Sequence, residues 1–324
     1  MIHHITLTGR SIALACDGTV TTQHGAGGAT GAVYIEASHL TLLHDMRDGE
    51  FYRTGQNSWS PSGWRRLSEA PMRIADEQRR RTADDAPWDD PARHHSAWMA
   101  VLEDSAGALL VGCLDGRTPR LRADTAVLEA FTESGGSARW VILPGPATAV
   151  MARYARELGE SLGGREIEPQ SVWCSWYSYY EGISQEALER EIPQVAELGF
   201  STLQIDDGWE VAVGDWEAGE SFSDGMEAAA SRIREAGMQP GLWVAPFIAL
   251  PGSRAVRDYP EMFVHNADGG LAVAGSNWGG DYYALDTTHP TAQTYVRKLI
   301  AKIVHRWGFS YLKLDFINAA AIPG

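Results

Sequence analysis

The chain has 324 residues, of which 44% are hydrophobic and 21% are charged, enough for two ordinary domains. Its 42 acidic and 27 basic residues give a net charge of −15, which argues against a sequence-independent nucleic-acid binder and against attachment to anionic membranes. The three cysteines are isolated and odd in number, and the first residues lack the pattern of a signal peptide. We therefore expect a reduced, cytoplasmic location, with neither a disulfide framework nor a metal site.

Residues 1–165 are predicted to form an antiparallel β-sandwich followed by a linker helix. Short apolar runs alternate with turns rich in Gly, Asp and Ser, a spacing typical of a sandwich. These runs cover residues 5–7, 12–15, 32–35, 40–43, 97–102, 108–114, 126–131 and 139–143. The polar segment 68–96 contains three prolines and is expected to be a long excursion. A 3.6-residue apolar period predicts a helix over 147–158.

Residues 166–324 are predicted to form the first four βα units of a (β/α)8 TIM-type barrel. Strands are expected over 171–177, 200–206, 241–247 and 309–316, and helices over 184–198, 225–236 and 292–307. Short strands with polar residues at their carboxyl ends favour a barrel over a doubly wound sheet. Because a complete barrel needs roughly 250 residues, we expect a half-barrel here, with a long irregular segment before its last helix.

The fourth predicted strand carries two charged side chains on one face. Lys313 and Asp315 alternate with an apolar set formed by Leu312, Leu314 and Phe316. In a barrel the apolar set would face the helices, and the ammonium would hold the carboxylate ionised near the barrel mouth. A buried charge pair costs desolvation free energy, so contact with a ligand explains it better than stability does. A structural salt bridge is the alternative.

The second predicted strand ends in two acids, Asp206 and Asp207, followed by Gly208. Neighbouring side chains of a strand point to opposite faces, so the two carboxylates converge only where the strand breaks, and Gly208 supplies that break. The pair could accept hydrogen bonds from sugar hydroxyls, or it could form a turn that caps the next helix. Aromatic residues, which pack against the apolar faces of sugars, lie at the same end of the first and third strands: Trp176, Tyr177 and Trp243.

Taken in order, these segments resemble the α-galactosidases of glycoside hydrolase family 36, the melibiase group. The matching segments are Trp173-Cys174-Ser175-Trp176-Tyr177, Ile205-Asp206-Asp207-Gly208-Trp209, Gly241-Leu242-Trp243-Val244-Ala245-Pro246-Phe247, Leu312-Lys313-Leu314-Asp315-Phe316 and, in the β domain, Asn57-Ser58-Trp59-Ser60-Pro61-Ser62-Gly63. The resemblance implies a retaining glycosidase in which Asp315 is the nucleophile and Lys313 its sugar-binding neighbour. It also implies that Asp206 and Asp207 bind the O4 and O6 side of galactose. The implied aromatic subsite residues are Trp176, Tyr177, Trp243 and Trp59.

The chain departs from the family pattern in two ways. Some relatives carry a Glu two residues after the third-strand Trp, where this chain has Ala245, which bears on the preferred aglycone. The family's general acid/base belongs to the second half of the barrel, and no residue of 1–324 can be assigned to it. Asp281 and Asp286 are the only internal substitutes, but both precede the helix that leads into the fourth strand.

The resemblance implies α-galactoside oligosaccharides such as melibiose or raffinose as partners, with neither nucleic acid nor membrane, and it leaves a homo-oligomer open. It implies no metal and no organic cofactor. Three alternatives remain: a raffinose-synthase-like galactosyltransferase, a hydrolase of another α-glycoside, and a non-catalytic sugar-binding or structural fragment.

Overall fold

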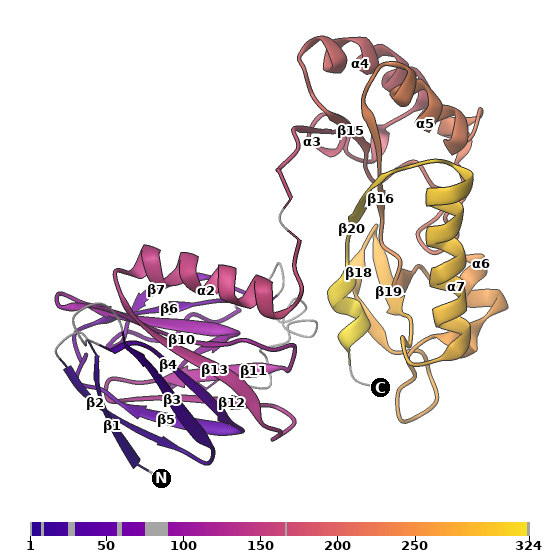
Figure 1. Ribbon diagram of the computed structural model, residues 1–324. Helices are drawn as coiled ribbons and strands as arrows, with labels where there is room; N and C mark the ends of the chain where they lie inside the picture. Colours follow the sequence, from indigo (N-terminus) through magenta and orange to yellow (C-terminus); the bar gives the residue numbers. More distant parts are fainter. Residues whose placement is uncertain are drawn as a thin grey trace. The chain divides into compact units, whose positions relative to one another are not determined.

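The computed structural model describes residues 2–7, 10–24, 30–56, 60–74, 90–165 and 167–322. The chain divides into two compact units, Met1–Glu166 and Ile167–Gly324 (Figure 1). Each unit has a hydrophobic core of its own. In the described ranges, no helix combines the length and the apolar character needed to cross a membrane.

The first unit contains two antiparallel sheets that pack face to face. One has the strand order β1 (Ile2–Leu7), β2 (Arg10–Cys16), β5 (His39–Leu43), β12 (Val127–Thr132), β11 (Pro119–Ala123) and β8 (His94–Ala97). The other has the order β3 (Thr19–His24), β4 (Thr30–Ala37), β13 (Ala138–Gly145), β10 (Gly107–Cys113), β9 (Met99–Asp104), β6 (Glu50–Arg53) and β7 (Gly63–Arg66). Apolar side chains from both sheets form one shared core. The predicted sandwich-like amino-terminal region is thus confirmed.

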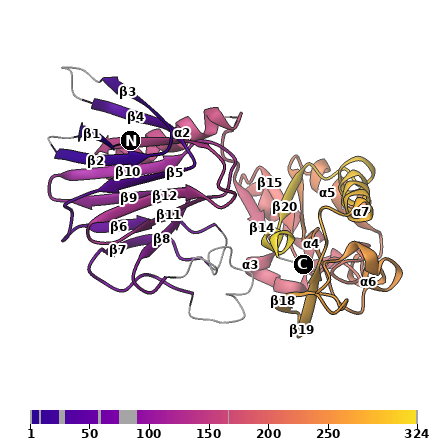
Figure 2. The same cartoon turned by 90° about the horizontal axis from the view of Figure 1, so that it is seen from below.

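Helix α2 (Ala147–Ser161) covers the outer face of the second sheet (Figure 2). It explains why β10 is apolar throughout: Leu109 and Val111 face the core between the sheets, whereas Leu110 packs beneath α2. The Tyr154 hydroxyl of α2 donates a hydrogen bond to the Cys113 carbonyl at 2.7 Å. The helix predicted over 147–158 is present.

Two expectations for this unit were wrong in detail. Segment 97–102 is not one strand, because Trp98 adopts a left-handed φ of 65° and the chain passes there from β8 in one sheet to β9 in the other. The excursion expected over 68–96 ends in β8, whose residues His94 and His95 are buried. Residues 75–89 of that excursion lie outside the described part of the chain.

The second unit is built on a parallel sheet with the order β14 (Val172–Cys174), β15 (Thr202–Ile205), β16 (Gln239–Val244) and β20 (Tyr311–Leu314). The connections contain the helices α4 (Gln185–Glu197), α5 (Met226–Glu235) and α7 (Pro290–Ala301), as the sequence predicts. Ser184 begins α4 by accepting the N–H of Ala187 at 3.2 Å, and Pro290 occupies the first turn of α7. Regular α-helical geometry stops at Ala301, and the rest of the predicted helix is a π-helical turn, η6 (Lys302–Arg306).

Sequence patterns missed several elements of this unit. The first strand stops at Cys174 instead of residue 177, and the chain continues as α3 (Trp176–Tyr179) and the 3-10 turn η3 (Tyr180–Gly182). The segment expected to be irregular contains a three-stranded antiparallel sheet with the order β17 (Ile248–Ala249), β19 (Gly280–Ala284) and β18 (Val273–Asn277). The remaining short elements are α6 (Arg254–Asp258), η4 (Glu220–Phe222), η5 (Pro260–Met262) and η7 (Ile317–Ala321).

Candidate functional site

The candidate site lies where the parallel strands of the second unit end. Lys313 of β20 pairs in register with Trp243 of β16, and Ile205 of β15 pairs with Leu242. Asp206, the residue after Ile205, therefore lies on the same level of the sheet as Trp243 and Lys313. The sheet brings together polar residues that are far apart in the sequence.

Asp206 is only 1% exposed and is surrounded by hydrogen-bond donors. Its Oδ2 accepts from Lys313 Nζ at 2.8 Å, from Cys174 Sγ at 3.1 Å and from Gln204 Nε2. Its backbone N–H donates to Ser175 Oγ at 2.8 Å. Because burying a carboxylate without partners is costly, this donor set compensates the desolvation of Asp206.

The two ionisable donors keep their protons at neutral pH. Burial lowers the pKa of Lys313, but the hydrogen bond and the charge of Asp206 outweigh it and raise the pKa above its ordinary value. Burial, together with the hydrogen bond to Asp206, raises the pKa of Cys174 to about 11. Lys313 is thus an ammonium and Cys174 a thiol, and both donate to the same carboxylate oxygen.

Asp315 is held differently from the expectation that Lys313 would pair with it. Its Oδ2 accepts from Trp243 Nε1 at 3.0 Å, and its Oδ1 accepts from the backbone N–H of Phe316 at 2.8 Å. Lys313 forms its ion pair with Asp206, whereas its interaction with Asp315 is purely electrostatic, without a hydrogen bond. The reason is the register of the sheet: Lys313 is level with Asp206, whereas Asp315 lies two residues further along the chain.

Phe316 also departs from the expected alternation. Its backbone adopts a left-handed φ of 51° immediately after the strand, so its ring does not join the predicted helix-facing set. The ring instead packs against Trp278 and Tyr282, with centroid separations of 5.1 and 5.5 Å. Leu314, the last residue of β20, is exposed.

Asp207 is 5% exposed and is held by two residues that the sequence analysis missed. Trp278 Nε1 donates to its Oδ2 at 2.8 Å, and the Glu210 carboxyl group shares a hydrogen bond with it. The chain turns at Gly208, where φ is 109° and a Cβ atom would lie 2.3 Å from the Glu181 carbonyl oxygen. Only glycine fits this turn, which brings Glu210 back to Asp207.

Burial is the main cause of the raised pKa values of Asp207 and Glu210. It raises the pKa of Asp207, although the hydrogen bonds with Glu210 and Trp278 act in the opposite direction. Burial and the hydrogen bond to Asp207 raise the pKa of Glu210 to about 8. Glu210 follows Asp207 by only three residues, with Gly208 between them, so the sequence could have indicated that the two carboxyl groups lie close together. No feature of the sequence indicates that Trp278 contacts Asp207.

Four aromatic residues, here called the aromatic wall, line the site beside the carboxylates: Trp243, Trp278, Tyr282 and Phe316. Trp278 lies in the turn between β18 and β19, two strands that are labelled in Figure 1. Its ring centroid is 6.4 Å from that of Trp243 and 6.2 Å from that of Tyr282. Trp243 is itself fully buried, as is Trp209, which packs against Trp307 and donates to the Trp243 carbonyl at 3.0 Å.

The other aromatic residues predicted to bind sugar are Trp176, Tyr177 and Trp59. Trp176 is half-buried on α3 and packs edge-on against Tyr180 at 5.3 Å, whereas Tyr177 is 82% exposed. In the described part of the chain, neither side chain hydrogen-bonds to Asp206 or Asp315. Trp59 lies outside the described residues.

Neither internal substitute for the acid/base is suited to that role. Asp286 accepts from the Thr288 N–H at 2.9 Å and from its hydroxyl at 2.6 Å, and these bonds lower the pKa of Asp286. It therefore caps a turn. Asp281 is an exposed residue of β19. Among the described residues, no three His, Cys, Asp or Glu side chains gather closely enough to hold a metal ion.

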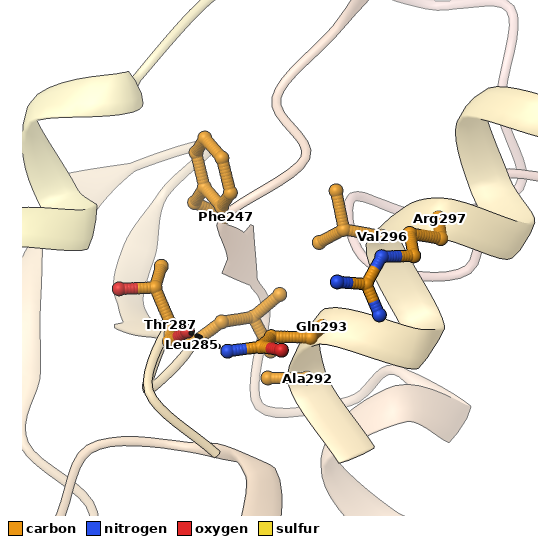
Figure 3. A pocket seen from close by; sticks show the side chains of 7 residues that line it. All are labelled: Phe247, Leu285, Thr287, Ala292, Gln293, Val296 and Arg297. Atoms are coloured by element: carbon orange, nitrogen blue, oxygen red, sulfur yellow. Dashed lines mark hydrogen bonds between the residues drawn. The ribbon is translucent and has the colours of Figure 1, made fainter. Parts of the chain in front are cut away.

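A separate pocket of about 200 Å³ opens beside the amino-terminal part of α7 (Figure 3). Its lining is mostly apolar, and the Gln293 side chain is already engaged with the Thr287 carbonyl at 3.1 Å. It shares no residue with the carboxylate cluster. The lining residues are Phe247, Leu285, Thr287, Ala292, Gln293, Val296 and Arg297.

Comparisons with known proteins match this architecture. A model of the melibiase family matches residues 167–321. The α-galactosidase AgaA of Geobacillus stearothermophilus is 24% identical over 173 residues, which are 49% of this chain and 23% of that protein. The structure of TtGalA, an α-galactosidase from Thermus thermophilus, in complex with stachyose is 34% identical, with a TM-score of 0.87. That match covers 100% of this chain and 69% of TtGalA.

The complex of TtGalA with p-nitrophenyl α-D-galactopyranoside gives a TM-score of 0.88 at 34% identity, and the match covers 100% of this chain and 65% of that one. The chain therefore spans about two thirds of TtGalA, and the aligned segment covers less than a quarter of AgaA.

Proposed function

Because the chain belongs to the melibiase family, we propose that it is the amino-terminal portion of a retaining α-galactosidase. The observation that carries the proposal is the cluster of Asp206, Asp207 and Asp315 at one edge of the parallel sheet, with Lys313 paired to Asp206. Carboxylates and an ammonium can hydrogen-bond to sugar hydroxyls, aromatic rings can pack against the apolar faces of a sugar, and a carboxylate can act as the nucleophile of a glycosidase.

In the proposed reaction, Asp315 attacks the anomeric carbon of galactose as the bond to the leaving oxygen breaks, which gives a covalent glycosyl-enzyme. Water then releases galactose with retained configuration. The donors from Trp243 and Phe316 hold one oxygen each and fix the direction of the carboxylate. The acid/base would come from a part of the enzyme without a counterpart in residues 1–324, with its carboxyl group roughly 5–5.5 Å from Asp315.

Substrate recognition follows from the remaining members of the cluster. Asp206 and Asp207 would accept hydrogen bonds from the galactose O4 and O6 hydroxyls, with Lys313 beside them. The aromatic residues Trp176, Tyr177, Trp243 and Trp59 would complete the sugar subsite. Oligosaccharides such as melibiose or raffinose are the proposed substrates, which is supported by the stachyose bound to TtGalA.

Three broader features belong to the same proposal. Residues 1–165 would form the sandwich domain, and residues 166–324 the first four βα units of a (β/α)8 barrel. The chemistry would need no metal and no organic cofactor, since two carboxyl groups suffice for retaining hydrolysis. A cytoplasmic location is proposed from the three cysteines, all of which are free thiols.

The decisive experiment removes the nucleophile. In the full-length protein, Asp315→Asn should lower kcat on an aryl α-galactoside by several orders of magnitude, and azide should partly restore turnover by replacing the carboxylate. Asp281→Asn, an exposed aspartate of the same unit, is the matched control and should remain active. Full activity of Asp315→Asn would overturn the assignment. Product analysis with an added acceptor sugar distinguishes hydrolysis from galactosyl transfer.

A further inference from the structure

The side chains of Asp207 and Glu210 are hydrogen-bonded to each other beside the turn at Gly208. Two ionised carboxylates have only acceptor oxygens, so a hydrogen bond between them exists only when one of them is protonated. Asp207 also accepts from Trp278 Nε1 at 2.8 Å, and Glu210 Oε2 accepts from the Gly208 N–H at 3.4 Å. The Asp207 carboxylate is therefore fixed from two sides, by the indole of the hairpin and by the Glu210 carboxyl group.

We propose that Glu210 is a positioning residue, which in its protonated form donates to Asp207 and holds that carboxylate in the orientation that receives the sugar hydroxyl. This inference rests on the proposed function, in which Asp207 binds galactose. It follows that galactose binding depends on the proton shared by the pair, and that binding weakens when the pair becomes fully ionised.

The distribution of the proton supports this assignment. Burial raises the pKa of both groups, but the hydrogen bonds with Glu210 and Trp278 act against that rise at Asp207. At Glu210 the hydrogen bond to Asp207 adds to the effect of burial, and the pKa reaches about 8. At neutral pH, Glu210 thus holds the proton as donor and Asp207 is the acceptor.

Three neighbouring groups, Cys174, Tyr282 and Lys313, do not produce the same titration. The ionisable residues on the elements next to the pair are Asp206 after β15, Glu181 in η3, Tyr282 on β19, Cys174 on β14, Lys313 on β20, Asp315 after β20, and Asp215 and Glu217 on the loop that follows Glu210. Asp215 forms an ion pair with Arg254, and Glu217 forms one with Lys302. Burial raises the pKa of Cys174 to about 11 and that of Tyr282 above its ordinary value. The pKa of Lys313 is also raised, because Asp206 outweighs the effect of burial. These three groups keep their protons through pH 9.

The size of the effect follows from the fraction of protein that is competent to bind. If only the protonated pair binds galactose, the apparent Kd rises as that form is depleted. With a pKa of about 8 for Glu210, the competent fraction falls from about 0.9 at pH 7 to about 0.03 at pH 9.5, and the Kd rises roughly 30-fold. Binding at pH 8 should also take up about half a proton.

The test measures galactose binding by calorimetry between pH 6.5 and 9.5 in the full-length protein. Glu210→Gln should bind at neutral pH and lose the alkaline weakening, because an amide N–H donates to Asp207 at every pH. Glu210→Ala should bind weakly at every pH. Glu217→Gln, on the same loop with a side chain 50% exposed and paired with Lys302, is the matched control and should keep the wild-type profile.

An alkaline weakening that persists in Glu210→Gln would overturn the inference. Proton uptake by the wild-type protein, measured at pH 8 in buffers of different ionisation enthalpy, needs no variant, and its absence would overturn the inference even if the variants failed to fold. The proposed function is tested separately at pH 6.5: a wild-type protein that does not prefer galactose to glucose contradicts it. Galactose binding without pH dependence contradicts only the role of Glu210.

Discussion

Replacing Asp206 by Asn is expected to destabilise the second unit, because it removes the charge that anchors Lys313. The Asp206 side chain is almost fully buried and accepts three donors on one oxygen. Asparagine keeps the shape but presents a neutral acceptor, or turns its amide toward donors that it cannot satisfy. The Lys313 ammonium would then lose its ion-pair partner.

The structure sets the size of this effect. Breaking a buried ion pair by removing one partner costs about 3–5 kcal/mol, and hydrogen bonds to charged groups contribute about 1.5–3 kcal/mol each. The Lys313 side chain is 35% exposed, so water can solvate the ammonium and offset part of the lost ion pair with Asp206. We therefore expect a loss of about 2–3 kcal/mol. A loss of 1 kcal/mol lowers Tm by about 2–4 °C in a domain of this size, which gives a decrease of roughly 4–12 °C.

The assay is thermal unfolding followed by tryptophan fluorescence, with Lys313→Met and the double variant completing a double-mutant cycle. A coupling free energy of about 1–2 kcal/mol is expected, since the two residues are in direct contact. An Asp206→Asn protein that melts within 1–2 °C of the wild type, or single effects that simply add, would refute the reasoning. A higher Tm would mean that burying the ion pair costs more than its bonds contribute.

Three further outcomes are expected. Asp207→Ala should weaken galactose binding about 5- to 150-fold, because an unpaired buried partner costs about 1–3 kcal/mol; unchanged affinity in calorimetry would indicate a structural turn instead. Trp278→Phe keeps a ring but removes the donor to Asp207, so affinity should fall about tenfold, and an unaltered Kd would contradict that role. A protein consisting of residues 1–324 should not hydrolyse an aryl α-galactoside, because no residue in it can be assigned as the general acid/base. General acid catalysis accelerates such reactions by about 10²–10⁴-fold. Turnover within about tenfold of TtGalA would disprove this last expectation.

The general location of the site was predictable because it depends on topology. Parallel strands end at one edge of a sheet, so a sequence that places Asp206, Lys313 and Asp315 at strand ends also places them near one another. The start of α4 was predictable as well, since Ser184 caps the helix through a local hydrogen bond. The boundaries of α7 were not: the apolar pattern predicts a helix over 292–307, whereas the helix begins at Pro290 and regular geometry stops at Ala301.

The partner of Lys313 could not be predicted from the sequence. Alternation along one strand tells which residues share a face, but it does not give the register between strands. The register places Lys313 opposite Trp243 and level with Asp206, so that the long lysine side chain reaches across the sheet instead of along its own strand. The neighbour in sequence, Asp315, receives the indole N–H of Trp243.

Trp278 was missed because its hairpin lacks the usual signals. The strands β17, β18 and β19 are two to five residues long, and β18 contains an irregularity between Val273 and Gly275. The two-residue turn has φ values of 49° at Trp278 and 77° at Gly279. Such turns favour Asn or Asp at the first position, and a tryptophan there gives no indication of a hairpin.

Trp278, which donates to Asp207 in the candidate site, has a left-handed backbone conformation. A non-glycine residue in this conformation costs roughly 1–2 kcal/mol, and such strain persists where surrounding contacts enforce it, most often at binding sites. In the described part of the second unit, the non-glycine residues with positive φ are all aromatic: Tyr180, Trp216, Trp278 and Phe316. Trp278 and Phe316 pack against each other, and Trp216 packs against Trp243. Two of these four residues contact the carboxylates: Trp278 donates its indole N–H to Asp207, and Phe316 donates its backbone N–H to Asp315. The strain at these two positions therefore lies in the candidate site, whereas Trp216 is a buried core residue.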